Sequence, residues 1–469
     1  MSEARSADAG GGPLVMKFGG TSVKDAAAIR RLAAHVAARR ERRPVVVVSA
    51  LSGVTDELVA LARDACAGVT QAELAPRVDA LLARHSAEGA RLLDGELRER
   101  LARTLEAARS GLVAVLEMMA AHPGTRRPLG DEVLSWGERL SSVLVAEALR
   151  AEGVPGQWVD ARRCIRTDER HGHAEPILAL TRESTRSEVL RALASDAVPV
   201  MGGFIGGTVQ GATTTLGRGG SDFTAALVGA ALDASEIQIW TDVSGFMTAD
   251  PRVVPSARSI PRLSYDEAAE LAYFGAKVLH PRTLHPAVEG GVPVRVCNSM
   301  HINAPSTLID AAGGPSVPGG VKAVAHKGGV SIVRITSARM LGASGFLRAI
   351  FEVFDSQRIV VDVVATSEVS VSVTVDEPER IPDAVHALEA LGRVEVEDGY
   401  AIVCAVGDGL RTTPGVAGRV FGTLADVNVA LISQGASGIN LTFAVREEDA
   451  ADTVRRLHAA CVDPPSEDN

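Results

Sequence analysis

The sequence predicts an α/β chain in which a three-layer α/β/α domain is followed by two smaller ferredoxin-like units. Three observations predict this class. Valine-rich runs such as "PVVVVSA" are apolar at every position, which is typical of strands buried on both faces of a parallel sheet. Helical patterns alternate with these runs up to about residue 310. Beyond that point short β-α-β-β-α-β patterns recur, which indicates a tandem repeat.

The first domain opens with the strand "PLVMKF", a helix over about 25–40 and the strand "PVVVVSA". From 55 to 150, leucine and alanine recur at three- and four-residue spacing, so nearly the whole stretch is expected to be helical. A strand and glycine-rich turn ("AVPVMGGFIGGTV"), a turn and helix ("TTLGRGGSDFTAALVGAAL") and a strand and loop ("EIQIWTDVSGFMT") come next. A helix at about 265–274 and the strand "VPVRVCN" lead to the end of this domain near Asp310.

The segment "DAAGGPSVPGG" is typical of a linker, and two ferredoxin-like units follow it. The early strand "VKAVAHK" is expected to complete the second unit, so that one repeat is inserted within the other. The predicted segments are a disordered lead-in (1–13), the first domain (14–310), the linker (311–320), the first repeat (321–397) and the second repeat (398–469, completed by strand 321–327).

Composition narrows the class of protein. A chain of 469 residues can bury a large core in two or three domains. Its net charge of -10 and its 3% aromatic content disfavour nucleic-acid partners, because they supply neither a basic surface nor stacking platforms. The five cysteines form no CxxC pair, and neither a signal-peptide core nor a membrane-length apolar run is seen. We therefore expect a cytoplasmic protein with reduced thiols and no membrane partner.

Two glycine-rich turns connect strands to helices, "KFGGTS" at Lys17 and "GRGGSD" at Gly217. Glycines let backbone N–H groups approach an anion, and a helix N-terminus adds partial positive charge. Either turn alone is equally well explained as a strand-to-helix turn, with Thr21 or Ser22 as the N-cap of the first helix.

Both turns together favour phosphoryl transfer, because one carries Lys17 and the other carries Arg218 and Asp222. A lysine close to an aspartate can orient a reacting phosphate. The G-x-x-x-x-G-K-[ST] spacing of the Walker A loop is absent, so the turns indicate a different class of kinase.

Seven motifs, in this order, resemble the aspartokinase family: "KFGGTSV", "VVVVSALSGVTD", "GERLSS", "GGFIG", "TTTLGRGGSD", "WTDVSGFMTADPR" and "FGAKVLHP". The resemblance runs from about Val15 to the C-terminus and implies an amino-acid-kinase domain followed by two ACT domains. The segments "MLGASGFL" and "VVDVVATSEVSVS" are most similar to those of the monofunctional, lysine-sensitive aspartokinases.

The resemblance also implies site residues. Lys17 would contact the transferring phosphate and Asp222 would orient it, and both count as catalytic. The positions that would line the aspartate pocket are Ser49, Thr55, Glu138, Phe204, Arg218 and Ser221. The positions that would hold ATP are Lys17, Gly19, Gly20, Thr241, Asp242, Met247, Arg252, Lys277 and Val278. These residue types suit the chemistry, since Arg218 can bind a carboxylate with two hydrogen bonds and Glu138 can pair with an ammonium group.

An effector site is implied as well. The positions that match lysine-contacting residues are Met340, Val361, Asp362, Thr366, Ser367 and Glu368. Four residues depart from the lysine-sensitive pattern. Trp136 replaces a histidine, Met247 replaces a tyrosine beside the nucleotide, and Gly342 and Ala343 replace polar residues of the effector segment. Lost hydrogen bonds at a buried polar site weaken binding, so the sequence leaves open whether lysine, threonine or neither inhibits.

The predicted function is the phosphorylation of the β-carboxylate of L-aspartate by ATP with Mg²⁺, which gives 4-phospho-L-aspartate for lysine, threonine, methionine and diaminopimelate synthesis. The ACT domains would form a homodimer or homotetramer and bind L-lysine as effector. The alternatives are a lysine-insensitive aspartokinase of a specialised pathway, a related kinase acting on glutamate, carbamate or a nucleotide, and a catalytically silent amino-acid sensor.

Several candidate residues have plainer interpretations. Glu138 could be a helix-surface acid paired with Arg139 or a nearby lysine, and Asp242 could cap a turn. In "RHGHAEP" the H-x-H pattern has no acid cluster beside it, so both histidines are expected to be surface loop residues rather than metal ligands. His280 is expected to pack or cap near its following proline.

Overall fold

The computed structural model describes residues 11–122, 126–275, 279, 281–315, 320–342 and 344–463. Most of the predicted lead-in, residues 1–10, lies outside them. By internal contacts the chain divides into two compact units. The first comprises Met1–Gly245, Pro261–Tyr265 and Val278–Gly313, and the second comprises Phe246–Ile260, Asp266–Lys277 and Gly314–Asn469. No helix in the described part of the chain is both long and apolar enough to cross a lipid bilayer.

An eight-stranded sheet forms the centre of the first unit, with strand order β3-β5-β2-β1-β8-β10-β11-β9. Its neighbouring strands are parallel except for β10 and β11. The strands are β1 (Leu14–Phe18), β2 (Pro44–Val48), β3 (Gly156–Trp158), β5 (Val198–Gly202), β8 (Glu236–Thr241), β9 (Arg262–Ser264), β10 (Val294–Asn298) and β11 (Thr307–Asp310). A smaller sheet contains β4 (Arg166–Thr167), β6 (Ile205–Thr208) and β7 (Thr213–Thr215).

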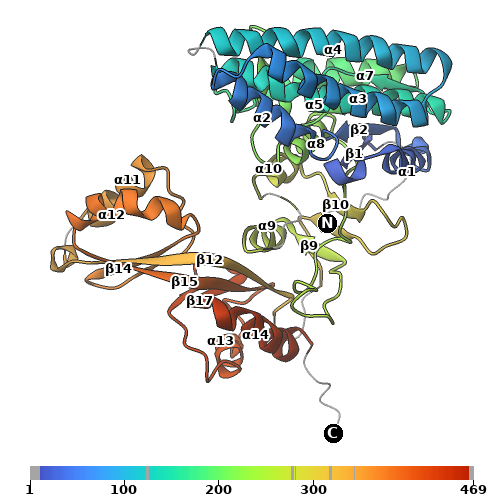
Figure 1. Ribbon diagram of the computed structural model, residues 1–469. Helices are drawn as coiled ribbons and strands as arrows, with labels where there is room; N and C mark the ends of the chain where they lie inside the picture. The colour runs from blue at the N-terminus through green and yellow to red at the C-terminus, as the bar shows by residue number, and fades with distance from the viewer. Residues whose placement is uncertain are drawn as a thin grey trace. The chain divides into compact units, whose positions relative to one another are not determined.

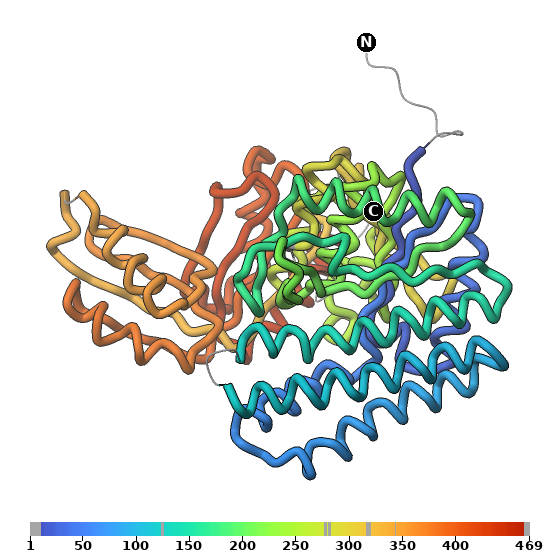
Figure 2. Tube along the Cα trace, turned by 90° about the horizontal axis from the view of Figure 1, so that it is seen from above, coloured from blue at the N-terminus to red at the C-terminus, as the bar shows by residue number. Residues whose placement is uncertain are grey.

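Helices complete the layers of this unit. They are α1 (Ala26–Ala37), α2 (Val54–Cys66), α3 (Gln71–Leu92), α4 (Gly95–Ala121), α5 (Arg126–Ala151), α6 (Ala161–Cys164), α7 (Leu178–Ala194), α8 (Gly220–Ala231) and α10 (Pro281–Gly290). The long helices α3, α4 and α5 run alongside one another, as Figure 2 shows in blue to teal. One large apolar core contains residues of the five helices α1–α5 and of strands β1 and β2. Helix α8 packs against β1, β2 and β8, and helices α7 and α10 pack against α8.

Alternation along β1 decides which side chains meet which helices. Successive side chains of a strand point to opposite faces. Leu14, Met16 and Phe18 lie in the apolar core with α1–α5. Lys17 therefore points to the other face of the sheet, where it meets α8. A charged residue within an otherwise fully buried strand thus reaches a carboxylate instead of the apolar core.

The N-cap of the first helix is not the one that the sequence suggested. Thr21 and Ser22 belong to a short 3₁₀ turn, η1 (Gly20–Ser22), and neither caps α1. Asp25 is the N-cap, with its Oδ1 accepting a hydrogen bond from the Ala28 N–H at 2.8 Å. This short turn delays the start of the helix, so the cap falls three residues after Ser22 and four after Thr21.

A six-stranded antiparallel sheet forms the second unit, in the order β13-β14-β12-β15-β17-β16. Its strands are β12 (Ala323–Thr336), β13 (Val364–Thr366), β14 (Ser370–Val375), β15 (Arg393–Val406), β16 (Leu431–Gln434) and β17 (Asn440–Arg446). Its helices are α9 (Tyr265–Tyr273, except its first residue), α11 (Phe346–Ser356), α12 (Ile381–Glu389), α13 (Val416–Gly422) and α14 (Glu447–Leu457). Helices α11 and α12 cover one part of the sheet and α13 and α14 another (Figure 1).

The long strands β12 and β15 are shared by two apolar cores. Residues 323–327 of β12 pair with 402–406 of β15, beside β17 and the core under α13 and α14. The remainder of β12, after register shifts between Lys327 and Ile332, pairs with β14 beside the core under α11 and α12. The first part of β12 thus packs with the core under α13 and α14. The domain bounds drawn from the sequence remain a prediction.

Replacing Asp25 by alanine should destabilise the first unit by about 1 kcal/mol, because the substitution removes the N-cap hydrogen bond of α1. The control Thr21→Ala should leave stability nearly unchanged. The chain's three tryptophans, 136, 158 and 240, all lie in this unit, so urea unfolding followed by tryptophan fluorescence reports on it. Equal midpoints for the two variants would contradict the assignment of the cap.

Candidate active site

A cavity of about 430 Å³ opens in the first unit where parallel strands end. Residues that follow the carboxyl ends of β2 and β5, together with α5 and the start of α8, form its walls, and ligands favour this edge of α/β sheets. All eight residues expected to be catalytic or to line the aspartate pocket lie in its wall: Lys17, Ser49, Thr55, Glu138, Phe204, Arg218, Ser221 and Asp222. Gly20 from the expected ATP set lines it as well.

Lys17 and Asp222 form an ion pair, with 2.6 Å between Nζ and Oδ1. Their side chains are 10% and 14% exposed, so the pair is largely shielded from solvent but still borders the cavity. Lys17 is supplied by β1 and Asp222 by the first turn of α8. The ammonium group is thus held at the cavity wall by a carboxylate, where an incoming anion can also reach it.

The turn that starts α8 requires its glycines. Gly217 and Gly219 have φ values of 78° and 74°, in the left-handed region that favours glycine. A Cβ at Gly217 would lie 2.5 Å from Nδ1 of His173. Arg218, between the two glycines, is exposed at the cavity wall and forms no ion pair among the described residues. Its guanidinium is available to bind an anion in the cavity.

Glu138 is a buried carboxyl group with unused hydrogen-bonding capacity. Its residue is 4% exposed, its Oε1 accepts the Ala50 N–H at 3.1 Å, and its Oε2 has no hydrogen-bond partner. Burial raises the pKa of this carboxyl to about 8, and the Ala50 hydrogen bond only partly opposes that effect. A buried acceptor at a cavity wall suits a cationic ligand group.

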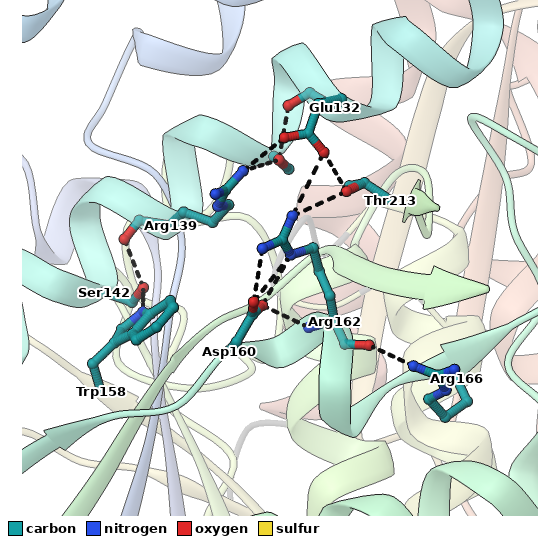
Figure 3. A network of polar contacts seen from close by, with 9 residues as sticks. Glu132, Arg139, Ser142, Trp158, Asp160, Arg162, Arg166 and Thr213 are labelled. Atoms are coloured by element: carbon teal, nitrogen blue, oxygen red, sulfur yellow. Dashed lines mark hydrogen bonds and ion pairs between the residues drawn. The ribbon is translucent and has the colours of Figure 1, made fainter. Parts of the chain in front are cut away.

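The plainer interpretation of Glu138 as a surface acid is wrong, because the residue is buried and Arg139 pairs with Glu132 at 2.8 Å instead. Glu132 also receives a hydrogen bond from Thr213 and lies 3.6 Å from Arg162, which binds Asp160 at 2.7 Å (Figure 3). This polar network ties α5 to the segment before α6 and to β7. It fixes the helix that carries Glu138.

Phe204 has a strained backbone at the cavity wall. Its φ of 65° is unusual for a residue with a side chain, and such strain concentrates at functional sites. Its N–H donates to Oγ1 of Thr224 and its carbonyl accepts from the Leu216 N–H, so α8 and the preceding turn hold it in place. Nearby, the Ser49 carbonyl accepts a hydrogen bond from Ser141 at 2.7 Å.

In the described ranges, no group of three or more histidine, cysteine, aspartate or glutamate side chains is arranged to hold a metal ion. The cavity wall does carry two aspartates, Asp56 and Asp222. Mg²⁺ in nucleotide sites is held by one or two carboxylates and by substrate phosphates, so this donor set fits a nucleotide-borne ion and not a protein cage.

Comparisons with known proteins agree with this geometry. Residues 12–298 match the amino acid kinase family, and residues 403–461 match the ACT domain. Lysine-sensitive aspartokinase 3 of Escherichia coli is 41% identical over 95% of this chain and 98% of its own length. The chain belongs to the aspartokinase family. The crystal structure of E. coli aspartokinase III with aspartate and ADP has a TM-score of 0.81 at 40% identity, covering 95% of this chain and 99% of that one.

A second crystal structure of E. coli aspartokinase III, with lysine and aspartate, also has a TM-score of 0.81 at 40% identity, and covers 96% of this chain and 99% of its own. The fold class and the aspartokinase resemblance predicted from the sequence are therefore confirmed. The roles of individual residues remain predictions.

The positions expected to hold ATP in this aspartokinase are divided between the two units. Gly19, Gly20, Thr241 and Asp242 belong to the first. The Gly19 N–H donates to the Trp240 carbonyl at the end of β8, and Thr241 donates to Asp242. Met247 and Arg252 lie on the segment that groups with the second unit, where Arg252 pairs with Asp250 at 2.6 Å. Lys277 and Val278, like His280, lie outside the described residues.

The expected effector residues all belong to the second unit of this aspartokinase. Met340 ends the short 3₁₀ turn η4 (Ala338–Met340), and Met340 and Val361 pack against the core under α11 and α12. Thr366, Ser367 and Glu368 are exposed at the end of β13, and Ser367 hydrogen-bonds Ser370 at 2.8 Å. The sixth residue, Asp362, is buried in an ion-paired cluster.

Two departures from the lysine-sensitive pattern have visible structural roles, one in packing and one in backbone conformation. Trp136 lies under the Arg139 guanidinium, 3.5 Å from its ring centre, and a Cβ at Gly111 would touch its ring. Gly342 has a φ of 68°, in the left-handed region that glycine adopts more readily than residues with a side chain. Met247 forms an isolated antiparallel β-bridge with Ser259 through the backbone. Ala343 lies outside the described residues.

One expectation about the histidines is wrong. His171 is not a free surface residue, because its Nδ1 lies 2.8 Å from Oδ2 of Asp131, and its side chain is only 13% exposed. Asp131 also accepts hydrogen bonds from the Gly172 N–H and from Thr215, just before the turn at Gly217. His173 is exposed as expected. The sequence carried no signal for this pairing, since the two partners are 40 positions apart.

The residue analysis missed part of the cavity wall. Ala50, Leu51, Ser52 and Gly53 line it between β2 and α2, and Asp56 lines it from the first turn of α2. All five lie in the quoted motif "VVVVSALSGVTD", so the motif was the available signal. Their side-chain types alone did not indicate a role.

Replacing Gly203 by alanine should lower kcat/KM for the phosphoryl acceptor by about 100-fold, because the new Cβ would lie 2.6 Å from the Ser221 Cα and must displace the turn that carries Arg218. The control is Gly130→Ala, where the added Cβ meets open space. Initial rates over a substrate series provide the measurement. Wild-type kinetics for Gly203→Ala would show that the close approach is unimportant.

Proposed function

We propose that this chain is an aspartate kinase that transfers the γ-phosphoryl group of ATP to the β-carboxylate of L-aspartate, giving ADP and 4-phospho-L-aspartate. The observation that carries the proposal is one cavity that combines the Lys17–Asp222 pair with the Glu138 carboxyl and the Arg218 guanidinium. The E. coli aspartokinase III structure with aspartate and ADP supports aspartate as the acceptor and an adenine nucleotide as the phosphoryl carrier.

Recognition of aspartate would use charges of both signs. The substrate carries two carboxylates and one ammonium group. Arg218 has no ion-pair partner among the described residues and can bind a carboxylate through two parallel hydrogen bonds. The unpartnered Oε2 of Glu138 can accept the ammonium group. Ser49, Thr55 and Ser221 would supply hydroxyl groups, and Phe204 would bound the pocket.

The chemical step needs no strong general base, because the attacking carboxylate is already an anion. Its main barrier is repulsion between that carboxylate and the γ-phosphate. Lys17, held by Asp222, and the N–H groups at the start of α8 would offset this repulsion. In-line placement of the two reactants would supply much of the remaining acceleration. Mg²⁺, held by the ATP phosphates and by Asp222 or Asp56, would supply further charge neutralisation.

We further propose that the second unit makes the activity responsive to L-lysine, and that ACT domains of two or more chains assemble into a homo-oligomer. The lysine complex of E. coli aspartokinase III supports lysine as the effector. Its binding would shift a conformational equilibrium in favour of a less active arrangement. The product would feed synthesis of lysine and the related amino acids.

Replacing Lys17 by methionine should lower kcat by at least about 1000-fold, because among the described residues of the cavity wall it removes the one lysine while nearly keeping side-chain length. Aspartyl phosphate trapped as the hydroxamate measures the activity. Lys24→Met, an exposed lysine outside the cavity wall, is the control and should retain full activity. Substantial hydroxamate formation by Lys17→Met would refute the catalytic role, and no hydroxamate from the wild type would refute the function.

The KM for aspartate should fall as pH rises from about 6 to the Glu138 pKa of about 8, and then level off. Above its ordinary pKa but below 8, the buried carboxyl is mostly neutral, so binding the substrate ammonium requires loss of its proton. Glu138→Gln should raise this KM about 100-fold at pH 8 and abolish its pH dependence. A wild-type KM that does not vary between pH 6 and pH 8 would contradict the assigned role.

A further inference from the structure

The Asp362 carboxylate, expected to bind an effector ammonium group, already has partners within the second unit. Its side chain is 1% exposed. Oδ2 lies 3.2 Å from Nζ of Lys327, and Oδ1 accepts a hydrogen bond from the Tyr273 hydroxyl. The same Lys327 ammonium lies 2.6 Å from Oδ2 of Asp376 and 4.9 Å from the centre of the Tyr273 ring. We name these four residues the Lys327 cluster.

Both Asp362 oxygens are therefore occupied, one by an ammonium group and one by a phenol. A second ammonium group cannot enter this nearly buried position without displacing Lys327, because two adjacent cations would repel each other in a low-dielectric site. Lys327 ends in the same four-carbon stem and ammonium group as free L-lysine. Chemically, it resembles an internal copy of the ligand that the site is expected to take.

The cluster includes the end of α9, which in the sequence precedes a position expected to hold nucleotide. Tyr273 is the last residue of α9 and precedes Lys277 by four positions. In the second unit, the Val324 N–H of β12 donates to the Thr248 carbonyl, next to Met247. Burial and the hydrogen bond to Asp362 both raise the Tyr273 pKa, so its hydroxyl remains a proton donor at neutral pH.

A second ion pair connects α9 to the start of β12, the strand that carries Lys327. Lys322 Nζ lies 2.7 Å from Glu267 Oε1 near the start of α9, and the side chains are 5% and 2% exposed. Breaking such a fully buried pair is costly. The Lys327 cluster is more exposed to solvent than the Lys322–Glu267 pair, since the Lys327 and Asp376 side chains are 22% and 30% exposed. The start of α9 is thus firmly attached and its end is attached through a contact that a ligand can replace.

We propose that Lys327 occupies the ammonium subsite of the effector, and that an effector ammonium group displaces it from Asp362 and frees Tyr273, which weakens nucleotide binding through the end of α9. This inference rests on the proposed function, from which it takes lysine as ligand and nucleotide as the second ligand. Lys327 and Tyr273 would thereby set both the affinity for lysine and its coupling to the nucleotide.

The first test is calorimetric titration of L-lysine into the full chain without nucleotide. Lys327→Met removes the competing ammonium group and keeps a stem of similar length, so the Kd for lysine should fall at least fivefold. The exposed Lys24→Met is the control for loss of one positive charge and should bind as the wild type does. A Kd for Lys327→Met within twofold of wild type, or no lysine binding by either protein, would overturn the proposal.

The second test measures ADP affinity by calorimetry with and without saturating L-lysine. Lysine should weaken ADP binding to the wild type, and Tyr273→Phe should reduce that factor at least threefold. Tyr400→Phe is a matched control in the same unit, because the Tyr400 hydroxyl donates to Glu397 and a guanidinium lies over its ring. An unchanged factor in Tyr273→Phe, or an equal loss in Tyr400→Phe, would overturn the proposal.

These titrations need no turnover, so they are independent of the aspartate kinase activity itself. Absence of aspartyl hydroxamate from the wild type would refute the proposed function, whereas the lysine and ADP titrations would still decide the role of the Lys327 cluster. Circular dichroism during unfolding gives a midpoint for every variant and shows whether a changed Kd reflects misfolding. If the midpoint of Lys327→Met or Tyr273→Phe is lowered, Lys327→Gln or Tyr273→Leu replaces that variant in the same titration.

Discussion

The ion pair between Lys17 and Asp222 sets the arrangement on which the rest of the candidate site depends. It joins the central strand β1 to the first turn of α8, so the sheet and the helix N-terminus meet at one point. A lysine inside a buried strand costs free energy unless a carboxylate receives it. The same carboxylate keeps the ammonium group at the cavity wall, where the proposed phosphoryl transfer would need positive charge.

Glu138, in contrast to Lys17 and Asp222, is a buried ionisable group without an ion-pair partner among the described residues. Its carboxyl has one backbone donor and one unpartnered oxygen, so burial favours the neutral form and raises its pKa to about 8. A cationic ligand would restore the charged form. Free energy lost on burying the group would then be recovered on substrate binding. The network of Glu132, Arg139 and Arg162 keeps its helix in position for this role.

In the second unit, ionic groups act as connections between elements. The Lys322–Glu267 pair is fully buried, while Lys327 is shared between Asp362 and Asp376 at a partly hydrated position. Desolvation makes the first pair hard to separate, and partial hydration makes the second easier to exchange. Such a difference in burial is a physical basis for a ligand to release one end of α9 and leave the other in place.

The sequence by itself determined the α/β class, the tandem repeat and the family, and its motifs marked nine residues of the cavity wall, because hydrophobic period, glycine-rich turns and ordered motifs are local properties. Only the tertiary structure decided contacts between distant positions. His171 pairs with Asp131, 40 positions away, and Lys327 pairs with Asp362, 35 positions away. Such pairings depend on which elements pack together, and no local pattern records that.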